Sequence, residues 1–437
     1  MKNYITLPLI LVLIAVCAIR LHAQKYVGGD ISMLKKFVDE GAIYYDNNGV
    51  ATAPLTIFKN AGWNSMRVRL FVDPTKASLD DRKQGAIQDF DYVIALGKEI
   101  KAAGFSFMLD FHYSDTWTDP GKHATPDVWT GMSVEQLKAQ VYEYTKDCLE
   151  QLNAAQATPD FIQVGNEITT GMLWQTGRIY AGGGAPTGGS WDSFAGYLAS
   201  SIKACNELCP DAKIVIHTEL HAPADVPKFY NHLAAYSGVS YDIVGLSYYP
   251  DFHGDLSVLE DVINTLETQN STKNKQIMIV ETGYGFKWQL GGAKYDFTST
   301  WTLTEAGQKA FAHDLIEMLN SHANVNGLYW WYPEYNLNNI VFPDGDDRET
   351  TPPADWNKDF TAGYWNGALF HYCTGKALAA LYELENFASA SGIKTIGQLD
   401  NLQLDNSVYD LQGRKVNVNV NVKKGVYIVN GKKVIIK

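Results

Sequence analysis

The sequence predicts an α/β protein in which a (β/α)8 TIM barrel precedes a small C-terminal β module. Three observations lead to this prediction. Eight short apolar runs alternate with helix-like segments between Tyr26 and Pro333, as expected for a parallel barrel. Two of these runs end abruptly in a glutamate, at the strand ends where such barrels carry functional side chains. After about residue 389 the composition changes to short alternating segments rich in Val and Lys.

The two ends of the chain predict segments outside the barrel. Residues 1–23 combine Lys2, an apolar core and a small residue, Ala23, which together predict a secretory signal peptide. No later segment reaches the roughly 20 apolar residues of a membrane span, so we expect an exported protein that is secreted, periplasmic or held at the cell surface. We assign residues 24–388 to the barrel and 389–437 to the β module, which is a sorting tail or a cap.

The charge of the chain restricts its partners. The whole sequence has a net charge of −12, and removal of Lys2 and Arg20 leaves 34 basic against 48 acidic residues, or −14. Such a surface repels polyanions, so we do not expect nucleic acid as a partner. A neutral polymer is compatible with it. The 25 Tyr and 11 Trp suit stacking against sugar rings, although large barrels also bury many aromatics. We expect a monomer.

The first three strands each carry polar residues near their C-terminal ends. We expect these strands at Tyr26–Ser32, Trp63–Val72 and Phe105–His112, with helices at Ala53–Ala61, Phe90–Ala103 and Val134–Asn153. Asp30 ends the first strand and is a candidate site residue. Alternation places Arg67 and Arg69 on one face of the second strand. A buried Arg is costly unless it pairs with an acid, so Arg69 is a candidate to position a catalytic carboxylate. A surface ion pair is the alternative.

The third strand and its loop hold a dense group of polar residues and one Trp. Asp110 and His112 share a strand face, and Trp117 follows closely. We interpret these three residues as a rim that contacts sugar. Asp115 and His123 lie nearby, so a metal site is the alternative interpretation.

Two strand-end glutamates are the main candidates for chemistry. Phe161 to Val164 is apolar at three of four positions and ends in Gly165-Asn166-Glu167, and Ile277 to Val280 ends in Glu281. Retaining glycosidases need two carboxyl groups about 5 Å apart, one as acid/base and the other as nucleophile. Asn166 is placed to hold the hydroxyl next to the reacting carbon. A structural turn with an exposed acid is the alternative for either glutamate alone.

The remaining strands supply four further candidates. We expect these strands at Lys213–Leu220, Ile243–Pro250 and Gly327–Pro333. His217 lies on the first of them, and Tyr248, with Tyr249 beside it, ends the second. An aromatic there would hydrogen-bond the nucleophile and favour its ionised form. Trp330 and Trp331 lie on the last strand, and we expect one of them to form the floor of a sugar pocket.

Cysteines and acidic loops give little sign of metal or cofactor binding. Cys148, Cys205, Cys209 and Cys373 lack zinc-ligand spacing, and we expect buried thiols with one long-range disulfide possible. The sequence Asp344-Gly345-Asp346-Asp347 could bind calcium but lacks the full EF-hand pattern. We therefore expect no required cofactor and no metal ligand, with structural calcium as an open alternative.

Several motifs together resemble the endo-β-1,4-galactanases of glycoside hydrolase family 53. The matching stretches are GGDISMLKK, GAIYYDNNG, MRVRLFVDP, LDFHYSDTWTDPGKH, VGNEITTGMLW, SYYP, IVETGYGF and LYWWYP. The resemblance covers about residues 26–387. It implies that Glu167 is the proton donor and Glu281 the nucleophile, with Asn166, Arg69 and His112 around them. Some bacterial members hold calcium, but the loop after Tyr332 does not display that arrangement.

The sequence thus gives one leading hypothesis and two alternatives. The resemblance implies retaining, endo-acting hydrolysis of β-1,4-galactosidic linkages in the (arabino)galactan side chains of pectin. One alternative is the same chemistry on another neutral β-glycan, such as mannan or glucan, because strand-end carboxylates do not encode the sugar. The other is a catalytically silent barrel that binds glycans. The C-terminal module lies outside the family and looks like the tails of exported proteins from Bacteroidetes-type bacteria.

Overall fold

The computed structural model describes residues 24–289, 292–339 and 367–389, and four short strands in the tail. The chain divides into a compact unit at Tyr26–Ala390 and a second unit that includes Ser391–Lys437. Three features predicted above lie outside the described residues. They are the signal peptide, the acidic loop at 344–347 and the alternating segment at 416–422.

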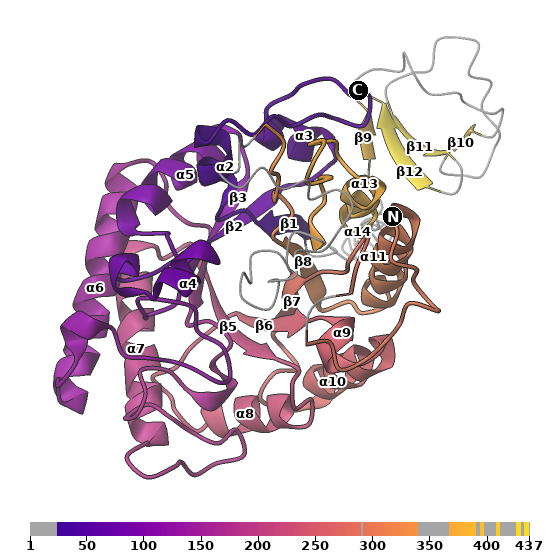
Figure 1. Ribbon diagram of the computed structural model, residues 1–437. Helices are drawn as coiled ribbons and strands as arrows, with labels where there is room; N and C mark the ends of the chain where they lie inside the picture. The colour runs from indigo at the N-terminus through magenta and orange to yellow at the C-terminus, as the bar shows by residue number, and fades with distance from the viewer. Residues whose placement is uncertain are drawn as a thin grey trace, which may run out of the picture. The chain divides into compact units, whose positions relative to one another are not determined.

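Eight parallel strands close into a barrel in which each strand pairs with the next and β8 pairs with β1 (Figure 1). The predicted TIM barrel is confirmed. The strands are β1 Tyr26–Asp30, β2 Ser65–Leu70, β3 Ser106–Phe111, β4 Phe161–Val164, β5 Lys213–Glu219, β6 Ile243–Tyr248, β7 Gln276–Thr282 and β8 Val325–Trp331.

Helices surround the barrel on the outside (Figure 1). They are α2 Leu34–Asp39, α3 Pro54–Asn60, α4 Leu79–Lys83, α5 Phe90–Ala102, α6 Val134–Ala154, α7 Trp191–Leu208, α8 Asp225–Leu233, α9 Pro250–His253, α10 Leu256–Thr268, α11 Glu305–Asn320, α13 Ala379–Glu383 and α14 Glu385–Ser389. Capping residues set their ends. The Asp89 side chain accepts a hydrogen bond from the Tyr92 amide and starts α5, while Gly104, at φ 77°, follows its last turn. Ser133 and Gln136 form a capping box on α6.

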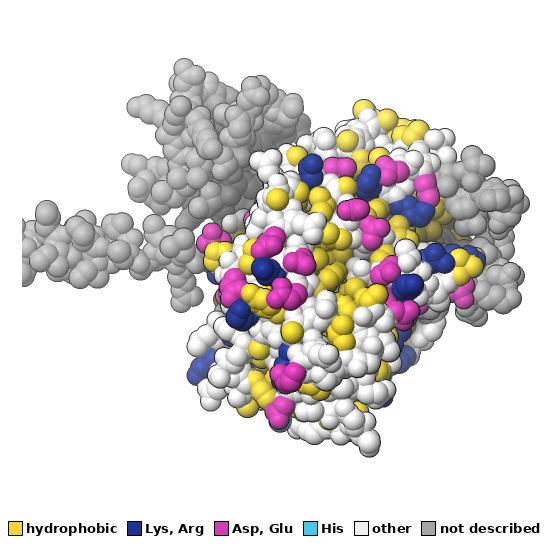
Figure 2. Space-filling model, turned by 90° about the vertical axis from the view of Figure 1, so that its left-hand side faces the viewer, with side chains coloured by type: hydrophobic (Ala, Val, Ile, Leu, Met, Phe, Trp, Pro, Cys, Tyr) yellow, Lys and Arg dark blue, Asp and Glu magenta, His cyan; other side chains and the backbone are white. Residues whose placement is uncertain are grey.

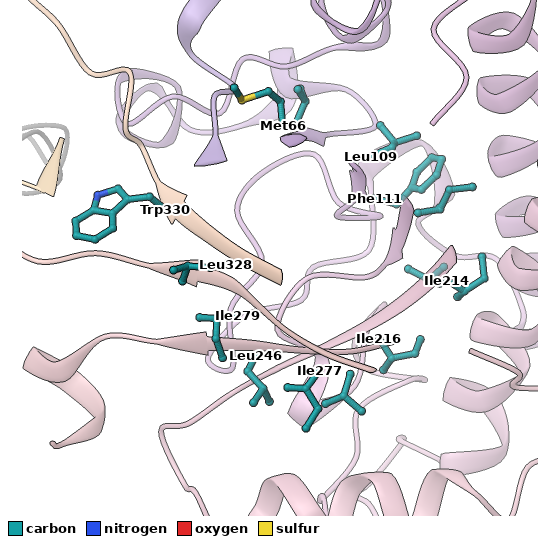
Figure 3. Close-up of a cluster of buried hydrophobic side chains, with 14 of the residues drawn as sticks. Met66, Leu109, Phe111, Ile214, Ile216, Leu246, Ile277, Ile279, Leu328 and Trp330 are labelled. Carbon is teal, nitrogen blue, oxygen red and sulfur yellow. The ribbon is translucent and has the colours of Figure 1, made fainter. Parts of the chain in front are cut away.

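The main hydrophobic core lies between the barrel wall and these helices. Strand residues that point outward, such as Leu109 and Phe111 on β3 and Ile277 and Ile279 on β7, are fully or almost fully buried there (Figure 3). Each such side chain contributes about 1.5–3 kcal/mol of burial free energy, so this shell is the principal source of barrel stability.

Inward-facing residues form two layers of opposite character. The lower layer is apolar and comprises Met108, Phe161, Val215, Ile243, Met278, Val280 and Tyr329. Above it, toward the C-terminal strand ends, the inward positions are polar and buried, among them Asp30, Arg67, Asp110 and His217. Buried charges must be paired, so this upper layer is where the site is expected.

The C-terminal tail forms a separate four-stranded sheet. Its order is β10-β11-β12-β9, from Val408–Asp410, Gly425–Val429, Lys432–Ile436 and Lys394–Ile396. β11 and β12 pair antiparallel, and β9 pairs parallel with β12. The boundary at 388 and the role of this module remain predictions.

The surface seen in Figure 2 is mixed in character. Acidic and basic side chains are interspersed there among apolar and uncharged groups. Within the described part of the chain, no helix combines the length and apolar character needed to cross a membrane. Cys148, Cys205 and Cys209 are buried thiols outside any disulfide, in line with the favoured expectation, whereas Cys373 is only half-buried.

Candidate active site

The guanidinium of Arg67 is the centre of the polar layer. Its Nη1 donates to Asp30 Oδ2 at 2.8 Å, and its Nη2 donates to Asp110 Oδ2 at 2.8 Å and to Asn166 Oδ1 at 2.9 Å. The same Nη2 forms an ion pair of 2.9 Å with Glu281 Oε1. Burial lowers the pKa of Arg67, but the surrounding carboxylates outweigh burial and raise it, so Arg67 is always charged.

Arg69 occupies a different position from the one predicted for it. Its Nη1 donates to Asp30 Oδ1 at 2.7 Å and its Nη2 to the Tyr332 hydroxyl at 3.0 Å, and the guanidinium lies 4.3 Å from the centre of the Trp117 ring. The contact with a candidate catalytic carboxylate therefore belongs to Arg67 rather than Arg69. Arg69 is buried, so the surface ion pair is wrong as well.

Glu281 is the second-last residue of β7, and both of its carboxylate oxygens have protein partners. Arg67 holds Oε1, and the Tyr249 hydroxyl donates to Oε2 at 3.1 Å. The prediction that an aromatic contacts this glutamate is correct, but the residue is Tyr249. Tyr248 is buried and donates to the Gly254 carbonyl at 2.8 Å instead. Burial raises the pKa of Glu281 above its ordinary value, as do the charges of Asp30 and Asp110, while Arg67 and Tyr249 oppose that rise.

Glu167 follows β4 through a tight backbone turn. Gly165 has φ 84°, and a Cβ there would lie 2.7 Å from Ile168 Cγ2, so only glycine fits. Glu167 itself adopts the left-handed conformation, with φ 49° and ψ 47°. Non-glycine residues seldom take this conformation, and it is concentrated at functional sites. The turn leaves Glu167 partly exposed while most of its neighbours are buried.

The surroundings of Glu167 favour its protonated form. Burial, the charge of Glu281 and the charge of Glu219 raise its pKa well above the ordinary value, and a hydrogen bond from Ser247 lowers it. The two glutamates thus lie close enough to interact electrostatically. Glu281 has a cation beside it, whereas Glu167 has carboxylates beside it. This difference moves the two pKa values apart, so that Glu167 is suited to be the acid and Glu281 the ionised partner.

Asn166 is held between two parts of the site. Its Oδ1 accepts from Arg67, and its Nδ2 donates to the Thr118 carbonyl at 2.8 Å. This fixes the orientation of the amide, because a guanidinium can only donate and a carbonyl can only accept. Asn166 is 5% exposed, and its contact with a substrate hydroxyl stays a prediction.

Three predicted contact residues lie beneath the site instead of lining it. Asp30, Asp110 and His217 are 0% exposed. Their polar atoms bind other protein groups: Asp110 Oδ1, for example, accepts from Gln163 at 2.6 Å. Direct contact between these three and a substrate is therefore corrected to an indirect role, because each holds a neighbour in place.

His112 is oriented by its two neighbours. Its Nδ1 accepts from the Thr118 amide at 3.2 Å, which places the proton on Nε2, 3.2 Å from Asp110 Oδ2. His112 is 2% exposed, so it too supports the site from below. Trp117 is partly exposed and covers Arg69, as expected of a rim residue.

Of the two tryptophans on β8, only Trp331 reaches the site. Trp330 is 0% exposed, donates from Nε1 to the Gly367 carbonyl at 2.6 Å and lies in the hydrophobic core (Figure 3). Trp331 is partly exposed, with its ring centre 6.2 Å from that of Trp117 and 6.5 Å from that of Tyr249. Trp331 thus lies beside Tyr249, which contacts Glu281, and Trp117 lies beside Trp331 and Arg69.

Sequence reasoning passed over three residues that the structure brings into the site. Gln163 and Ser247 lie on the inner faces of β4 and β6, and Glu219 ends β5 beside Glu167. Strand alternation was the signal for both polar residues. Gln163 lies two residues after the inward-facing Phe161, and Ser247 lies two residues after the inward-facing Gly245. Among the described residues, no group of three or more His, Cys, Asp or Glu is arranged to hold a metal ion. The proposed calcium loop lies outside them.

Comparison with known proteins adds a family and several relatives. The family model described as glycosyl hydrolase family 53 matches residues 26–384. The arabinogalactan endo-β-1,4-galactanase A of Aspergillus niger is 30% identical over 325 residues, which cover 72% of this chain and 86% of that protein. The family 53 catalytic domain of Ignisphaera aggregans superposes with a TM-score of 0.69 at 28% identity, covering 83% of this chain and 96% of that one. A fungal β-1,4-galactanase gives 0.67 at 27% identity, with 83% and 99% covered.

Proposed function

Because the chain belongs to glycosyl hydrolase family 53, we propose that it hydrolyses internal β-1,4-galactosidic linkages of galactan with retention of configuration. One observation carries the proposal. Arg67 connects Glu281 to Asn166, the residue beside Glu167, so the two strand-end glutamates share one polar network. Their unlike surroundings support unlike roles. The pKa of Glu167 is raised well above its ordinary value by burial and neighbouring carboxylates, which suits a proton donor, while Arg67 and Tyr249 favour the ionised form of Glu281.

The proposed reaction has two steps. In the first, Glu281 attacks the anomeric carbon while Glu167 donates its proton to the glycosidic oxygen, which leaves with the reducing-end fragment. In the second, Glu167, now ionised, takes a proton from water, and the water oxygen displaces Glu281 from the sugar. Asn166 binds the hydroxyl next to the reacting carbon, and Trp117 and Trp331 stack against sugar rings. No cofactor takes part in either step.

Product analysis on purified polysaccharides tests this function. We expect oligosaccharides of intermediate length from β-1,4-galactan and little release from β-mannan or β-glucan. Release from mannan or glucan but not galactan would assign the enzyme to that other neutral glycan. Binding to galactan without any release would identify a silent glycan-binding barrel.

We also propose that the protein is exported as a monomer after removal of residues 1–23. The basic start, apolar core and Ala23 support cleavage at that point. Mass spectrometry of the protein from its native host would give a mature mass that begins at Gln24. A full-length mass in the cytoplasm would contradict export. Size-exclusion chromatography with light scattering would report the oligomeric state.

A further inference from the structure

Arg69 on β2 contacts two aromatic rings from different parts of the barrel. Its guanidinium carbon lies 4.3 Å from the centre of the Trp117 ring and 4.8 Å from the centre of the Tyr332 ring. Arg69 is 1% exposed, so water does not compete for its charge, and cation–π contacts are strongest in such surroundings. The planar guanidinium thus packs against both rings.

Hydrogen bonds fix the guanidinium of Arg69 at two of its nitrogens. Nη1 donates to Asp30 Oδ1 at 2.7 Å, and Asp30 is held in turn by Arg67. Nη2 donates to the Tyr332 hydroxyl at 3.0 Å, and that hydroxyl gives its own hydrogen to the Gln84 carbonyl at 3.0 Å. A hydroxyl has a single hydrogen, so the Tyr332 oxygen is left to accept from Arg69.

The backbone of Tyr332 has a conformation that tertiary contacts must maintain. Its φ is 54°, in the left-handed region that residues with side chains seldom adopt. The chain after α4 approaches its ring closely, because a Cβ at Gly85 would lie 2.2 Å from the Tyr332 hydroxyl. Arg69 supplies two contacts to this ring, the hydrogen bond and the cation–π contact.

Both partly exposed tryptophans of the site belong to the same set of contacts. The ring centre of Trp331 lies 4.4 Å from that of Tyr332 and 6.2 Å from that of Trp117. Arg69, Trp117, Trp331 and Tyr332 therefore form a closed cycle in which each group contacts the next. A change at Arg69 reaches both tryptophans, directly at Trp117 and through Tyr332 at Trp331.

The planes of the Trp117 and Trp331 rings are inclined to each other by 63°. Sugar rings stack face to face on aromatic rings, so an inclined pair suits a chain whose neighbouring sugars are also inclined. In β-1,4-glucan and β-1,4-mannan both linkage bonds are equatorial, and the chain is a flat ribbon. In β-1,4-galactan the bond at O4 is axial, so the chain turns at every linkage.

We propose that Arg69 is a positioning residue that holds Trp117 and Trp331 at this inclination, and that the inclination selects β-1,4-galactan over flat, equatorially linked β-glycans. The inference rests on the galactan hydrolysis proposed above. Arg69 is buried, so it acts on the sugar through the two tryptophans and not by contact of its own.

Arg69→Lys is the principal test, because lysine keeps the charge beside Asp30 but lacks the planar fork that packs against the rings. We expect KM for galactan to rise about five- to tenfold, with a much smaller change in kcat, since neither glutamate is altered. Tyr332→Phe keeps the ring and loses one hydrogen bond to Arg69. It should raise KM in the same direction by a smaller factor, and it tests the inference even if Arg69→Lys fails to fold.

Selectivity is measured separately from turnover. Affinity electrophoresis of Glu281→Ala, which is expected not to cleave, would compare retention by β-1,4-galactan with retention by β-1,4-mannan. Addition of Arg69→Lys to this protein should weaken retention by galactan about five- to tenfold and leave retention by mannan unchanged. The preference for the bent chain would then be lost.

Arg178→Lys is the matched control. Arg178 also lies over an indole, 4.0 Å from the centre of the Trp174 ring, but that ring is outside the cycle defined above. We expect no change in KM or in retention for this variant. Urea unfolding would establish that all the variants are folded.

Three results would overturn the inference. They are an unchanged KM in folded Arg69→Lys and Tyr332→Phe, an equal effect in Arg178→Lys, and an equal loss of retention by galactan and mannan. If the wild-type enzyme cleaved mannan or glucan but not galactan, the proposed function would fail. If it cleaved galactan and Arg69→Lys bound galactan normally, only the role of Arg69 would fail.

Discussion

The Nη2 atom of Arg67 lies 2.9 Å from Glu281 Oε1 and forms an ion pair with that carboxylate. Arg67 is 1% exposed and also neutralises Asp30 and Asp110. It therefore serves two purposes, because it favours the ionised form of Glu281 and it makes the burial of two further acids tolerable.

Arg67→Met should impair both catalysis and stability. Loss of the cation raises the pKa of Glu281, which must be ionised to attack, so the acidic limb of kcat/KM moves to higher pH. The buried acids left without a partner should cost about 3–5 kcal/mol of unfolding free energy. Urea unfolding and a pH–rate profile measure the two effects. An unchanged acidic limb in a folded Arg67→Met protein would show that Glu281 does not depend on this contact.

Variants of the two glutamates should separate their roles. Glu167→Ala should reduce turnover of galactan by about 10²–10⁴-fold, and less on aryl glycosides whose leaving group needs no proton. Glu281→Ala should be equally inactive on both substrates, because no covalent intermediate forms. Circular dichroism would confirm that both variants fold. Near-normal activity in either one would remove the assignment.

The neighbouring residues Tyr248 and Tyr249 offer a matched pair. Tyr249→Phe removes the hydrogen bond to Glu281 Oε2, which raises the pKa of Glu281. The variant should have a lower kcat/KM, and the acidic limb of its pH–rate profile should move to higher pH. Tyr248→Phe removes a bond to the Gly254 carbonyl and should cost about 1 kcal/mol of stability with little effect on the limb. The reverse pattern would reinstate Tyr248 as the residue that contacts the nucleophile.

These residues illustrate what the sequence could and could not predict. Apolar runs that end in polar residues were sufficient to place eight strands and both glutamates. Alternation from Gly245 and Ser247 also favours Tyr249 as the inward residue, just as Tyr329 favours Trp331. The choice of Tyr248, and the naming of both Trp330 and Trp331, neglected this signal.

Other features left no such signal. Met278 and Val280 face inward on β7, so simple alternation would turn Glu281 outward. The register shifts between β7 and its neighbours bring it back into the site. The left-handed turn at Glu167 and the role of Arg67 as the contact to Glu281 likewise depend on tertiary packing. The alternation along a strand shows on which face of the sheet a side chain lies, but not which acidic residue it contacts.

Glu334 should make stability depend on pH. It is buried beside Asp30, its Oε1 accepts from the Met33 amide at 2.8 Å, and burial raises its pKa to about 8. In the unfolded chain this group ionises near pH 4.3. The native state retains its proton up to about pH 8, so its stabilising effect is complete below pH 4.3 and is lost as the pH rises to about 8.

Glu334→Gln keeps the acceptor for Met33 but cannot ionise. Relative to wild type, this variant should therefore gain stability steadily between about pH 4.3 and pH 8, as measured by urea unfolding across that range. Glu143→Gln on the exposed side of α6 serves as the control. A constant difference between wild type and Glu334→Gln at all pH values would contradict a neutral native Glu334.

Trp330 and Trp331 should respond to substitution in opposite ways. Trp331 is partly exposed beside Trp117, so Trp331→Ala removes a surface for sugar stacking and should raise KM for galactan by about tenfold, with unfolding free energy little changed. Trp330 is 0% exposed within the core, so Trp330→Ala leaves a cavity and should cost about 3–5 kcal/mol of stability. Steady-state kinetics and thermal unfolding of both variants test the pair. If folded Trp330→Ala raised KM as much as Trp331→Ala does, the assignment of sugar stacking to Trp331 rather than Trp330 would be wrong.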